Sequence, residues 1–276
     1  GSGKKPQTPT TWQMPSEKTN KNNKSDSKEN SNTAERASWK KNQGEESLIR
    51  VGLASDVVQA TISSPTGMHI LAGADKKDYG DFRSNIAAVL TVEGDVIAVN
   101  GKKSTSSSLV FVPVSGGNGS KVRYNNSDFR GQIVATAVGG KLIIANLISL
   151  EDYVKGVLPS EMSSGWNMEA LKAQAVAART YALYTKKQKV HLGDGYDLCN
   201  ATHCQVYDGV SGEVDVASAA VDATEGMIMV YQGVPIYAPY HASSGGVTEN
   251  SEDVWGNKLP YLRSVKDDDS KSPYHN

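Results

Sequence analysis

Strand-like patterns of apolar and polar residues dominate the chain from Ile49 to about Leu147. In VVQATISSPTGMHILAG the two kinds of residue alternate around a Pro-Thr-Gly turn, as they do in strands with one buried face. In AVLTVEGDVIAVNG and GQIVATAVGGKLIIANLI, the Glu-Gly-Asp and Gly-Gly steps predict hairpin turns. We therefore expect a β-rich lobe here, with residues 75–147 as a candidate sub-lobe.

Helical signals begin at Ser149, which has capping-box spacing with Asp152 and precedes an apolar stripe. We expect this first helix to stop at Pro159, because proline disfavours helical geometry in the residue before it. Asn167 is suited to cap a second helix, which should run to about Lys186. The LPSEM stretch between the two helices is then expected to form a short turn.

A third helix and a hairpin complete the pattern. The helix is expected from about Val214 to Thr224, and Gly226 is suited to its left-handed C-terminal cap. Two strands, MIMVY and VPIYAPY, follow and are joined by Gln-Gly. Strands first, then helices, then a hairpin indicate an α+β fold. We expect a substrate cleft between the β-rich lobe and the lobe made of helices and hairpin.

Composition separates residues 1–47 from the rest of the chain. This segment has almost no aliphatic side chains, so we expect a disordered linker, and the opening Gly-Ser-Gly is typical of a cloning remnant. Residues 48–276 are long enough for one large domain or two small lobes, and we expect them to form the catalytic domain. The net charge of −1 gives no support for nucleic-acid binding, and no apolar run is long enough to span a bilayer.

The second predicted helix is mostly alanine and valine, yet it carries Lys172 and Arg179. Buried cations are costly unless they are paired or needed. The two lie two turns apart on one face, which begins just after the turn that holds Glu161. A carboxylate and two cations on one wall suit an anionic or sugar substrate. The alternatives are a capping or solvent-facing role for Glu161, and ion pairs with Glu169 or Asp152 for the cations.

The single acid also limits the chemistry. Glu161 has no second carboxylate partner in the sequence, whereas most glycosidases use two carboxyl groups. One acid suffices where the substrate supplies the nucleophile, as when a sugar hydroxyl closes an intramolecular ring. Nearby cations would hold Glu161 ionised although a general acid must carry a proton, so we expect at least one cation to contact the substrate instead.

Two further stretches hold candidate chemistry. HASSGG sets a histidine beside two serines, but it lacks the G-x-S-x-G elbow of serine hydrolases. VHLGDGYDLCNATHC offers two cysteines and two histidines, the ligand set of a structural zinc site, namely His191, Cys199, His203 and Cys204. The spacing is not that of a zinc finger, and a Cys199–Cys204 disulfide is the rival, favoured outside the cell. Either would fix a loop in place without leaving an open metal position for catalysis.

Several stretches together resemble the SpoIID/LytB family: LISLEDYVKGVLPSEMSSGWNMEALKAQAVAARTYAL, THCQVYDG, ATEGMIMVYQGVPIYAPYHASSGGVTENSEDVWG and PYLRSVKDDD. The resemblance runs from about Ile49 to the C-terminus. It implies a peptidoglycan lytic transglycosylase of sporulation type, a lyase that cleaves glycan strands between N-acetylmuramic acid and N-acetylglucosamine and leaves a 1,6-anhydro ring. It also favours zinc over the disulfide. The implied catalytic acid and base is Glu161, and the implied substrate contacts are Lys172, Arg179, Ser243 and Ser244.

LytB-type relatives imply a rival function, that of a wall-binding protein without catalysis that enhances an autolytic amidase. Both interpretations expect an extracytoplasmic protein, secreted or anchored, whose partners are peptidoglycan glycan strands and other cell-wall hydrolases. We expect a membrane anchor only in a missing N-terminal segment. Family domains usually continue beyond a stretch like SPYHN, so we also expect a missing C-terminal segment.

Overall fold

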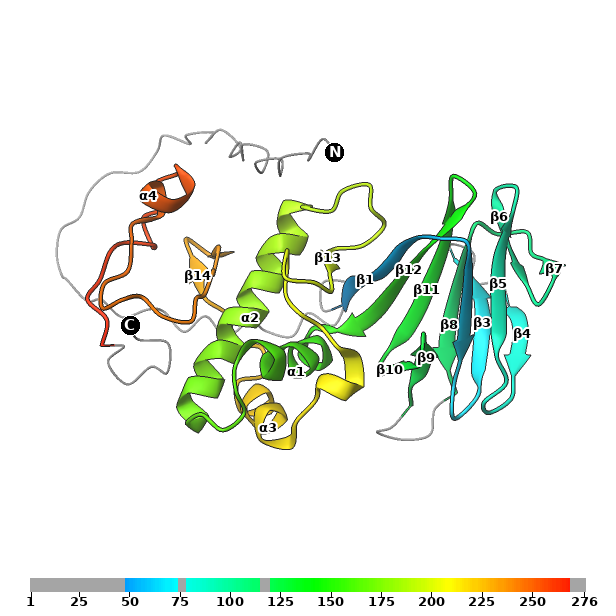
Figure 1. The fold of residues 1–276 in the computed structure, drawn as a ribbon, viewed down its shortest axis with the longest axis horizontal. Coiled ribbons are helices and arrows are strands. Elements are labelled where there is room, and N and C mark those ends of the chain that lie inside the picture. The colour runs from blue at the N-terminus through cyan, green and yellow to red at the C-terminus, as the bar shows by residue number, and fades with distance from the viewer. Residues whose placement is uncertain (1–47, 74–77, 115–119, 269–276) are drawn as a thin grey trace, which may run out of the picture. The chain divides into compact units, whose positions relative to one another are not determined.

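The structure, a computed structural model, describes residues 48–73, 78–114 and 120–268. All of them belong to one compact unit, Arg36–Asn276. The linker predicted for residues 1–47 lies outside the described residues. Within the described part, strands come first and helices follow, as Figure 1 shows from blue to red, so the predicted α+β fold is confirmed.

Two antiparallel sheets make up most of the N-terminal half. The first has the order β13 (Leu198–Cys199), β1 (Leu48–Val57), β12 (Lys141–Ser149), β11 (Gln132–Val138), β8 (Ser108–Pro113), β3 (Met68–Ala72) and β4 (Asp78–Phe82). The second has the order β10 (Ser127–Phe129), β9 (Val122–Tyr124), β2 (Gln59–Ser63), β5 (Ala88–Glu93), β6 (Val96–Val99) and β7 (Lys102–Lys103). The short β13 alone runs parallel to its neighbour in these pairings. Both sheets contain strands from either side of residue 75.

The core of the sheets comes from alternate residues of their strands. Leu109 and Phe111 of β8 point inward, as do Leu90 of β5 and Ile62 of β2 from the other sheet, and all four are fully buried. Burying side chains of this size stabilises a fold by about 1.5–3 kcal/mol each. The two sheets therefore share one apolar core.

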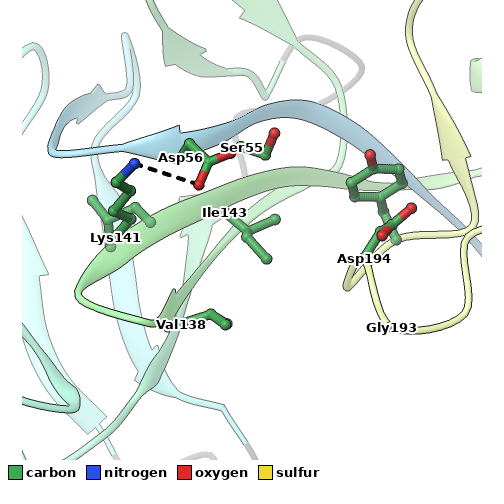
Figure 2. A pocket seen from close by; sticks show the side chains of 9 residues that line it. Ser55, Asp56, Val138, Lys141, Ile143, Gly193 and Asp194 are labelled. Atoms are coloured by element: carbon green, nitrogen blue, oxygen red, sulfur yellow. Dashed lines mark ion pairs between the residues drawn. The ribbon is translucent and has the colours of Figure 1, made fainter.

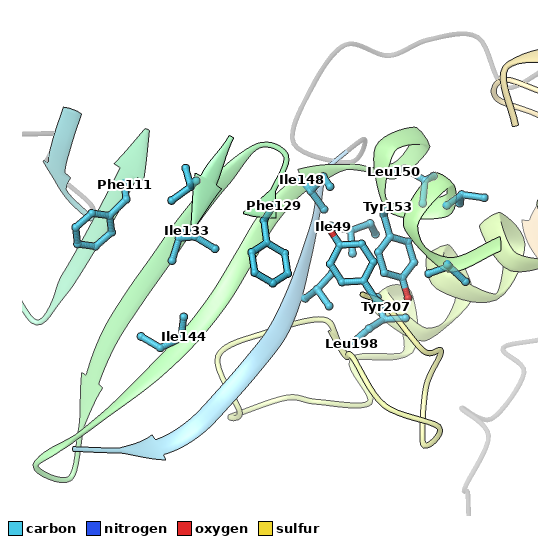
Figure 3. Packing of buried hydrophobic residues seen from close by; sticks show 14 of the residues in the cluster. Ile49, Phe111, Phe129, Ile133, Ile144, Ile148, Leu150, Tyr153, Leu198 and Tyr207 are labelled. Atoms are coloured by element: carbon cyan, nitrogen blue, oxygen red, sulfur yellow. The ribbon is translucent and has the colours of Figure 1, made fainter. Parts of the chain in front are cut away.

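Tyr207 extends this core to the helices. Its ring centroid lies 6.1 Å from that of Phe129 in β10 and 5.2 Å from that of Tyr153 in the first helix. Figure 3 shows these rings between the strands and the helix. Gly156 lets Tyr207 approach, because a Cβ there would lie 2.6 Å from the ring. Strands and helices are thus packed on a common aromatic centre.

The predicted turns divide into two kinds. The Gly139-Gly140 step joins β11 to β12, with Val138 opposite Lys141, and the Gly94-Asp95 step joins β5 to β6. Both glycine steps have the positive φ angles that tight hairpins need. The Pro-Thr-Gly turn differs, because β2 and β3 belong to different sheets. That turn carries the chain from one sheet to the other instead of closing a hairpin.

The first helix, α1 (Leu150–Glu161), begins as predicted and ends later than predicted. The Ser149 side chain accepts a hydrogen bond from the Asp152 backbone N–H at 3.1 Å, which confirms the cap. The prediction that Pro159 stops the helix is wrong, because α1 continues for two residues beyond it. Proline removes one helical hydrogen bond, but the Met162 N–H still bonds to the Leu158 carbonyl and closes the last turn. Glu161 is therefore the last residue of α1, and the prediction of a turn at LPSEM is wrong, because four of its five residues are helical.

The remaining elements follow the predicted order. α2 (Met168–Gln188) is capped by Asn167, α3 (Asp215–Ala223) precedes Gly226, and a hairpin joins β14 (Val230–Tyr231) to β15 (Val234–Pro235). A 3-10 helix (Gly209–Gly212) and α4 (Ser251–Trp255) were not predicted. Three of the eight buried residues of α2 are alanines, namely Ala175, Ala178 and Ala182, and α1 and α3 both pack against this helix. No helix among the described residues has the length and apolar character needed to cross a membrane.

Candidate functional site

Glu161 lies where the end of α1 meets the segment 206–208. The Val206 backbone N–H donates a hydrogen bond to Glu161 Oε1 at 2.9 Å. The neighbouring Ser160 hydroxyl donates to Asp208 Oδ2 at 3.1 Å, which ties the same end of the helix to the same segment. Glu161 is half-buried, so it is neither a plain solvent-facing acid nor sealed in the core.

A buried polar network lies next to Glu161 and is centred on Gln205, which is fully buried. The Gln205 amide nitrogen donates to the Ala178 carbonyl at 3.4 Å and to the Tyr240 hydroxyl at 3.2 Å. The amide oxygen accepts a hydrogen bond from the Tyr153 hydroxyl at 3.1 Å. One side chain thereby connects α1, α2 and the segment after β15.

The two tyrosines of this network keep their protons at neutral pH. Burial raises the pKa of the Tyr153 hydroxyl well above its usual value. Burial also raises the pKa of Tyr240; the hydrogen bond from Gln205 lowers it by a smaller amount, and the negative charge of Glu161 raises it. Both hydroxyls are therefore available as hydrogen-bond donors inside the site.

Lys172 lies on α2 and pairs with Glu169, at 2.7 Å between Nζ and Oε1. The lysine side chain is 31% exposed and that of Glu169 is 78% exposed. This ion pair is one of the alternatives stated for the cation. An exposed pair of this kind contributes little to stability and can exchange for another anion. Contact between Lys172 and substrate stays a prediction.

Lys172→Met is expected to lower the free energy of unfolding by less than about 1 kcal/mol, because the ion pair is solvent-exposed. If Lys172 binds glycan, the same variant loses affinity for purified strands in a sedimentation or calorimetric assay. Glu169→Gln is the matched control, because it removes the ion pair but keeps the lysine and should retain affinity. Equal affinity of wild type and Lys172→Met would remove the lysine from the binding surface.

Arg179 is fully buried inside the helical part and binds Glu151 with two nitrogens. Its Nε lies 2.9 Å from Glu151 Oε1, and its Nη2 lies 2.6 Å from Glu151 Oε2. It also donates to the carbonyls of Ala175, Val221 and Met227. This geometry matches the ion-pair alternative, with Glu151 as partner in place of Glu169 or Asp152. Substrate contact by Arg179 would require that pair to open.

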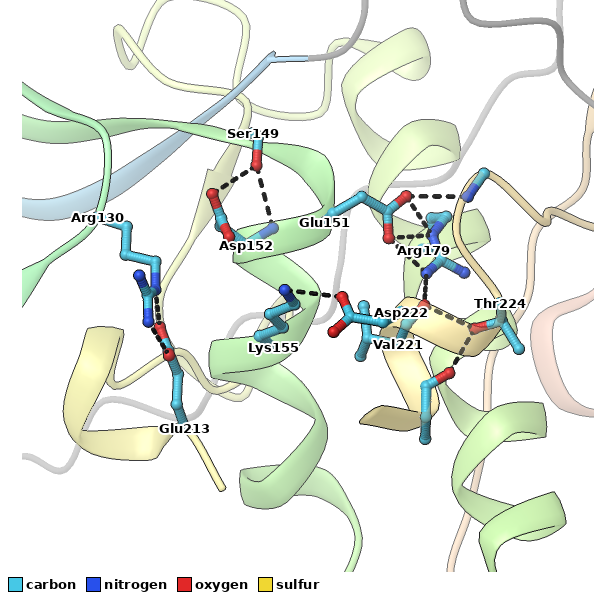
Figure 4. A network of polar contacts seen from close by, with 12 residues as sticks. Arg130, Ser149, Glu151, Asp152, Lys155, Arg179, Glu213, Val221, Asp222 and Thr224 are labelled. Atoms are coloured by element: carbon cyan, nitrogen blue, oxygen red, sulfur yellow. Dashed lines mark hydrogen bonds and ion pairs between the residues drawn. The ribbon is translucent and has the colours of Figure 1, made fainter. Parts of the chain in front are cut away.

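Figure 4 shows two further ion pairs in this region, of which the first involves α1 itself. Lys155 pairs with Asp222 of α3 at 2.8 Å, and Arg130 pairs with Glu213 at 2.6 Å. The Gly226 N–H donates a hydrogen bond to Glu151 at 3.1 Å. The acid that binds Arg179 therefore also holds the turn that follows α3. The helix that carries Glu161 is therefore held to several neighbouring segments.

Ser243 and Ser244 lie in a turn stabilised by its own side chains. The Ser244 hydroxyl donates to Asp267 at 2.8 Å and accepts from the Gly246 N–H at 3.2 Å. The Ser243 hydroxyl accepts from the Gly245 N–H at 3.4 Å. A bridge between Val247 and Lys266 continues this contact with the C-terminal segment. Hydrogen bonding of these serines to substrate stays a prediction.

The predicted metal ligands come together as a Cys/His cluster, which we define as His191, Cys199, His203 and Cys204. Their ligand atoms all lie within 4.8 Å of one another. His203 Nδ1 lies 3.6 Å from Cys199 Sγ and 3.5 Å from Cys204 Sγ, and His191 Nε2 lies 3.1 Å from Cys204 Sγ. In tetrahedral zinc sites, ligand atoms lie roughly 3.3–3.8 Å apart. Both cysteines are free thiols, and the four residues fit a zinc ion.

A second layer of contacts supports the cluster. His191 Nδ1 lies 2.8 Å from Asp194 Oδ2, so the ring nitrogen that faces away from the cluster has a carboxylate partner, as metal-binding histidines usually have. The loop that carries the cluster is fixed to β1 by the pairing of β13 with that strand. The Tyr196 ring of the same loop packs on Gly52, and a Cβ at Gly52 would lie only 2.6 Å from the ring. Burial raises the pKa of the Cys204 thiol to about 12, so a thiolate there needs a compensating cation.

Figure 2 shows a pocket of about 260 Å³ beside the same loop. Its walls come from β1, the hairpin of β11 and β12, and the loop before β13, and include Asp56, Lys141, Asp194 and Tyr196. None of the predicted catalytic, substrate-binding or metal-binding residues lines it. The cleft expected between the lobes therefore stays a prediction.

Gln205 and Tyr240 are the site residues that sequence reasoning missed. Both stand inside stretches that carry the family resemblance, THCQVYDG and VPIYAPYH, without a role assigned to them. The available signal was a glutamine directly after a candidate metal ligand, in a segment with apolar neighbours. A polar side chain in such a place needs partners once it is buried.

Comparison with known proteins identifies the region that contains this site. Residues 138–231 match the SpoIID family, described as Stage II sporulation protein. The Amidase enhancer of Bacillus subtilis is 44% identical over 114 residues, 41% of this chain and 15% of that protein. Stage II sporulation protein D of Bacillus subtilis is 40% identical over 140 residues, 46% of this chain and 41% of that protein. An uncharacterized protein of Brachyspira hyodysenteriae is 43% identical over 141 residues, 51% of this chain and 38% of that protein.

The predicted resemblance to the SpoIID family is thereby confirmed. The matched region contains Glu161, both cations of α2, the Cys/His cluster and Gln205, and it ends before Tyr240 and the two serines. The chain spans less than half the length of each relative named above.

Proposed function

We propose that this protein acts on the cell wall as a peptidoglycan lytic transglycosylase. The proposal starts from the match of residues 138–231 to the SpoIID family and from the similarity to Stage II sporulation protein D. The observation that carries the proposal is the environment of Glu161. It is a half-buried carboxylate held by the Val206 N–H, and the residue before Val206 is the fully buried Gln205. An acid oriented in this way suits proton transfer to and from a bound sugar.

In the proposed reaction, Glu161 first donates its proton to the glycosidic oxygen between N-acetylmuramic acid and N-acetylglucosamine. The bond from the anomeric carbon to that oxygen breaks, and the oxygen leaves as the hydroxyl of N-acetylglucosamine. The C6 hydroxyl of the muramic acid then attacks the anomeric carbon, and its proton returns to Glu161. The product end is a 1,6-anhydro ring, and the enzyme ends the cycle protonated as it began. One carboxyl group suffices, because the substrate supplies the nucleophile.

Lys172, Ser243 and Ser244 are the proposed substrate contacts. The lactyl carboxylate of muramic acid is a suitable partner for Lys172, whose present partner is an exposed glutamate. Arg179 belongs to the proposal only if its buried pair with Glu151 opens on binding.

A structural zinc ion in the Cys/His cluster is the proposed cofactor. All four protein ligands are present, which leaves no open position for a substrate or a reactive water. The ion would therefore stabilise the loop between α2 and Val206 and would take no direct part in the reaction.

A second function is supported by one relative, the Amidase enhancer of Bacillus subtilis. The corresponding proposal is a wall-binding protein that increases the activity of an amidase without cutting glycan itself. The cations and serines would serve glycan binding equally well in that protein. A catalytic role for Glu161 separates the two candidates.

Product analysis tests the proposed function. Purified glycan strands, with and without stem peptides, are incubated with the protein, and the products are identified by mass spectrometry. We expect fragments that end in 1,6-anhydro-N-acetylmuramic acid. Binding of the strands without fragmentation, together with faster hydrolysis by an added cell-wall amidase, would select the second function.

Protein purified without added metal is expected to contain one zinc ion per chain, measured by elemental analysis. Bonds of about 2.3 Å to sulfur and 2.0–2.1 Å to nitrogen would be seen by X-ray absorption. A strong chelator should lower the melting temperature, because the site cannot persist in the unfolded chain.

His69→Ala is the control for this measurement, because His69 pairs with Asp81 far along the chain from the cluster and should not change the zinc content. A chain without zinc whose mass is two hydrogens below the reduced value would instead assign a Cys199–Cys204 disulfide.

A further inference from the structure

We propose that the side-chain amide of Gln174 binds the N-acetyl group of a sugar held at Glu161. The inference rests on the proposed function for its ligand, the peptidoglycan glycan strand. It adds to the site a residue of α2 that has no part in the proposed reaction, and it names the part of the sugar that this residue recognises.

Gln174 carries a buried polar atom that has no partner. The residue is only 9% exposed. Among the residues that the structure describes, its Nε2 is the one buried side-chain nitrogen or oxygen that makes no hydrogen bond. Nearly all such groups in native proteins are paired, because an unpaired buried donor destabilises the fold. The free protein therefore keeps a hydrogen-bond donor that is ready to bind a ligand.

Gln174 lies on the face of α2 that meets the Gln205 network. Gln174 and Ala178 are four residues apart, so they are neighbours on one face of the helix. The Gln205 amide binds the Ala178 carbonyl at 3.4 Å. Tyr181, seven residues after Gln174, continues the same face, and its ring centroid lies 6.1 Å from that of Tyr237. The unpaired amide thus shares a face with the contacts that hold Gln205.

The directions of the two helices decide where Glu161 lies relative to this face. A short connection, residues 162–167, joins α1 to α2. The helices run in opposite directions, because Glu151 at the start of α1 binds Arg179 in the middle of α2. The end of α1, with Glu161, therefore lies toward the start of α2.

Gln174 is thereby placed between the Gln205 network and the proposed acid. It is one helical turn closer to the start of α2 than Ala178, which Gln205 binds. The residue after Gln205 binds Glu161, since the Val206 N–H lies 2.9 Å from Glu161 Oε1. A sugar held at Glu161 is therefore within the reach expected of the Gln174 side chain.

The chemistry of the side chain selects the part of the sugar. Both sugars of the strand carry an acetamido group, whose carbonyl oxygen can accept a hydrogen bond from Gln174 Nε2. Leu171 and Ala178, its neighbours on this part of α2, are fully buried and apolar. Burying the charged lactyl group of muramic acid against them would be costly. A neutral N-acetyl group is therefore the better partner.

Gln174→Met tests whether the amide is free in the protein alone, because it removes the amide and keeps the length of the side chain. We expect its melting temperature to equal or exceed that of wild type, since an unpaired buried donor is lost and no hydrogen bond is broken. Gln205→Met is the matched control. The same change at a buried glutamine with partners on both sides of its amide should lower the melting temperature. A similar fall in Gln174→Met would show a structural partner, direct or through water, and would overturn the inference.

The same variant tests the ligand. With peptide-free glycan strands and in the Glu161→Gln background, Gln174→Met should raise the dissociation constant roughly tenfold, the effect of losing one hydrogen bond in a desolvated site. Strands whose N-acetyl groups have been removed should bind equally well with glutamine or methionine at this position. An unchanged dissociation constant for acetylated strands would refute the contact. A tenfold difference that persists on deacetylated strands would refute the assignment to the N-acetyl group.

These measurements need no turnover, so they separate this inference from the proposed function. If wild type forms no anhydro products but Gln174→Met weakens binding as expected, the contact stands and the proposed reaction fails. If wild type forms the products and Gln174→Met binds acetylated strands as tightly as its parent, the reaction stands and the contact is refuted.

Discussion

Glu161→Gln is expected to abolish the formation of 1,6-anhydro products while leaving the fold and glycan binding intact. The amide keeps the shape of the side chain, and its oxygen can still accept the Val206 N–H bond seen at 2.9 Å. It cannot deliver or take up a proton. One acid–base group contributes roughly 10²–10⁴-fold to a rate, and here both proton transfers depend on the same group. The measurement is mass spectrometry of the products from purified glycan strands.

Glu169→Gln serves as the control for this variant, because it makes the same chemical change at an exposed acid on α2. Its turnover should stay close to that of wild type. Undiminished turnover in Glu161→Gln would remove Glu161 from its role. Loss of turnover together with a large fall in melting temperature would show that the acid is needed for folding instead.

Arg179→Ala is expected to lower the free energy of unfolding by about 3 kcal/mol, at the low end for a buried ion pair, because it leaves the half-buried Glu151 carboxylate without its partner. The arginine side chain is 0% exposed, and Glu151 beside it is 26% exposed. The carbonyls of Val221 and Met227 also lose a donor in this variant. Chemical denaturation at neutral pH measures the change.

Replacing both partners is the decisive comparison. In the double variant Glu151→Leu/Arg179→Met no charge is left unpaired, and much of the lost stability should return. If Arg179→Ala instead keeps its stability and loses affinity for glycan, the arginine binds substrate and its pair with Glu151 opens on binding.

Local features of the site and fold could be predicted from sequence because each depends on a few neighbouring residues. The caps of α1 and α2 are set by Ser149 and Asn167, whose side chains bond to backbone N–H groups two or three residues on. The ligands of the Cys/His cluster lie close together in sequence, and the structure also brings their ligand atoms together. Such contacts need no knowledge of the rest of the fold.

Contacts between distant segments could not be predicted in the same way. The partner of Arg179 is Glu151, on another helix, and sequence offered Glu169 and Asp152 as equally reasonable partners. Nothing in the alternation of β2 and β3 shows that they belong to different sheets, because pairing depends on strands far away. The contact between Gln205 and Tyr240 likewise joins two segments that only the fold brings together.

The position of the Cys/His cluster beside the edge strand β13, to which Cys199 belongs, has a consequence for aggregation of the protein. β13 covers the outer edge of β1 at Val51 and Gly52, and the backbone of Asp197 bonds to Arg50 just before it. Exposed strand edges pair readily with other chains and lead to aggregation. A cluster that fixes this loop therefore shields β1 from intermolecular strand pairing. Loss of the proposed zinc would expose the edge of β1, on which a second chain could pair. It would also loosen the segment whose Val206 N–H binds Glu161.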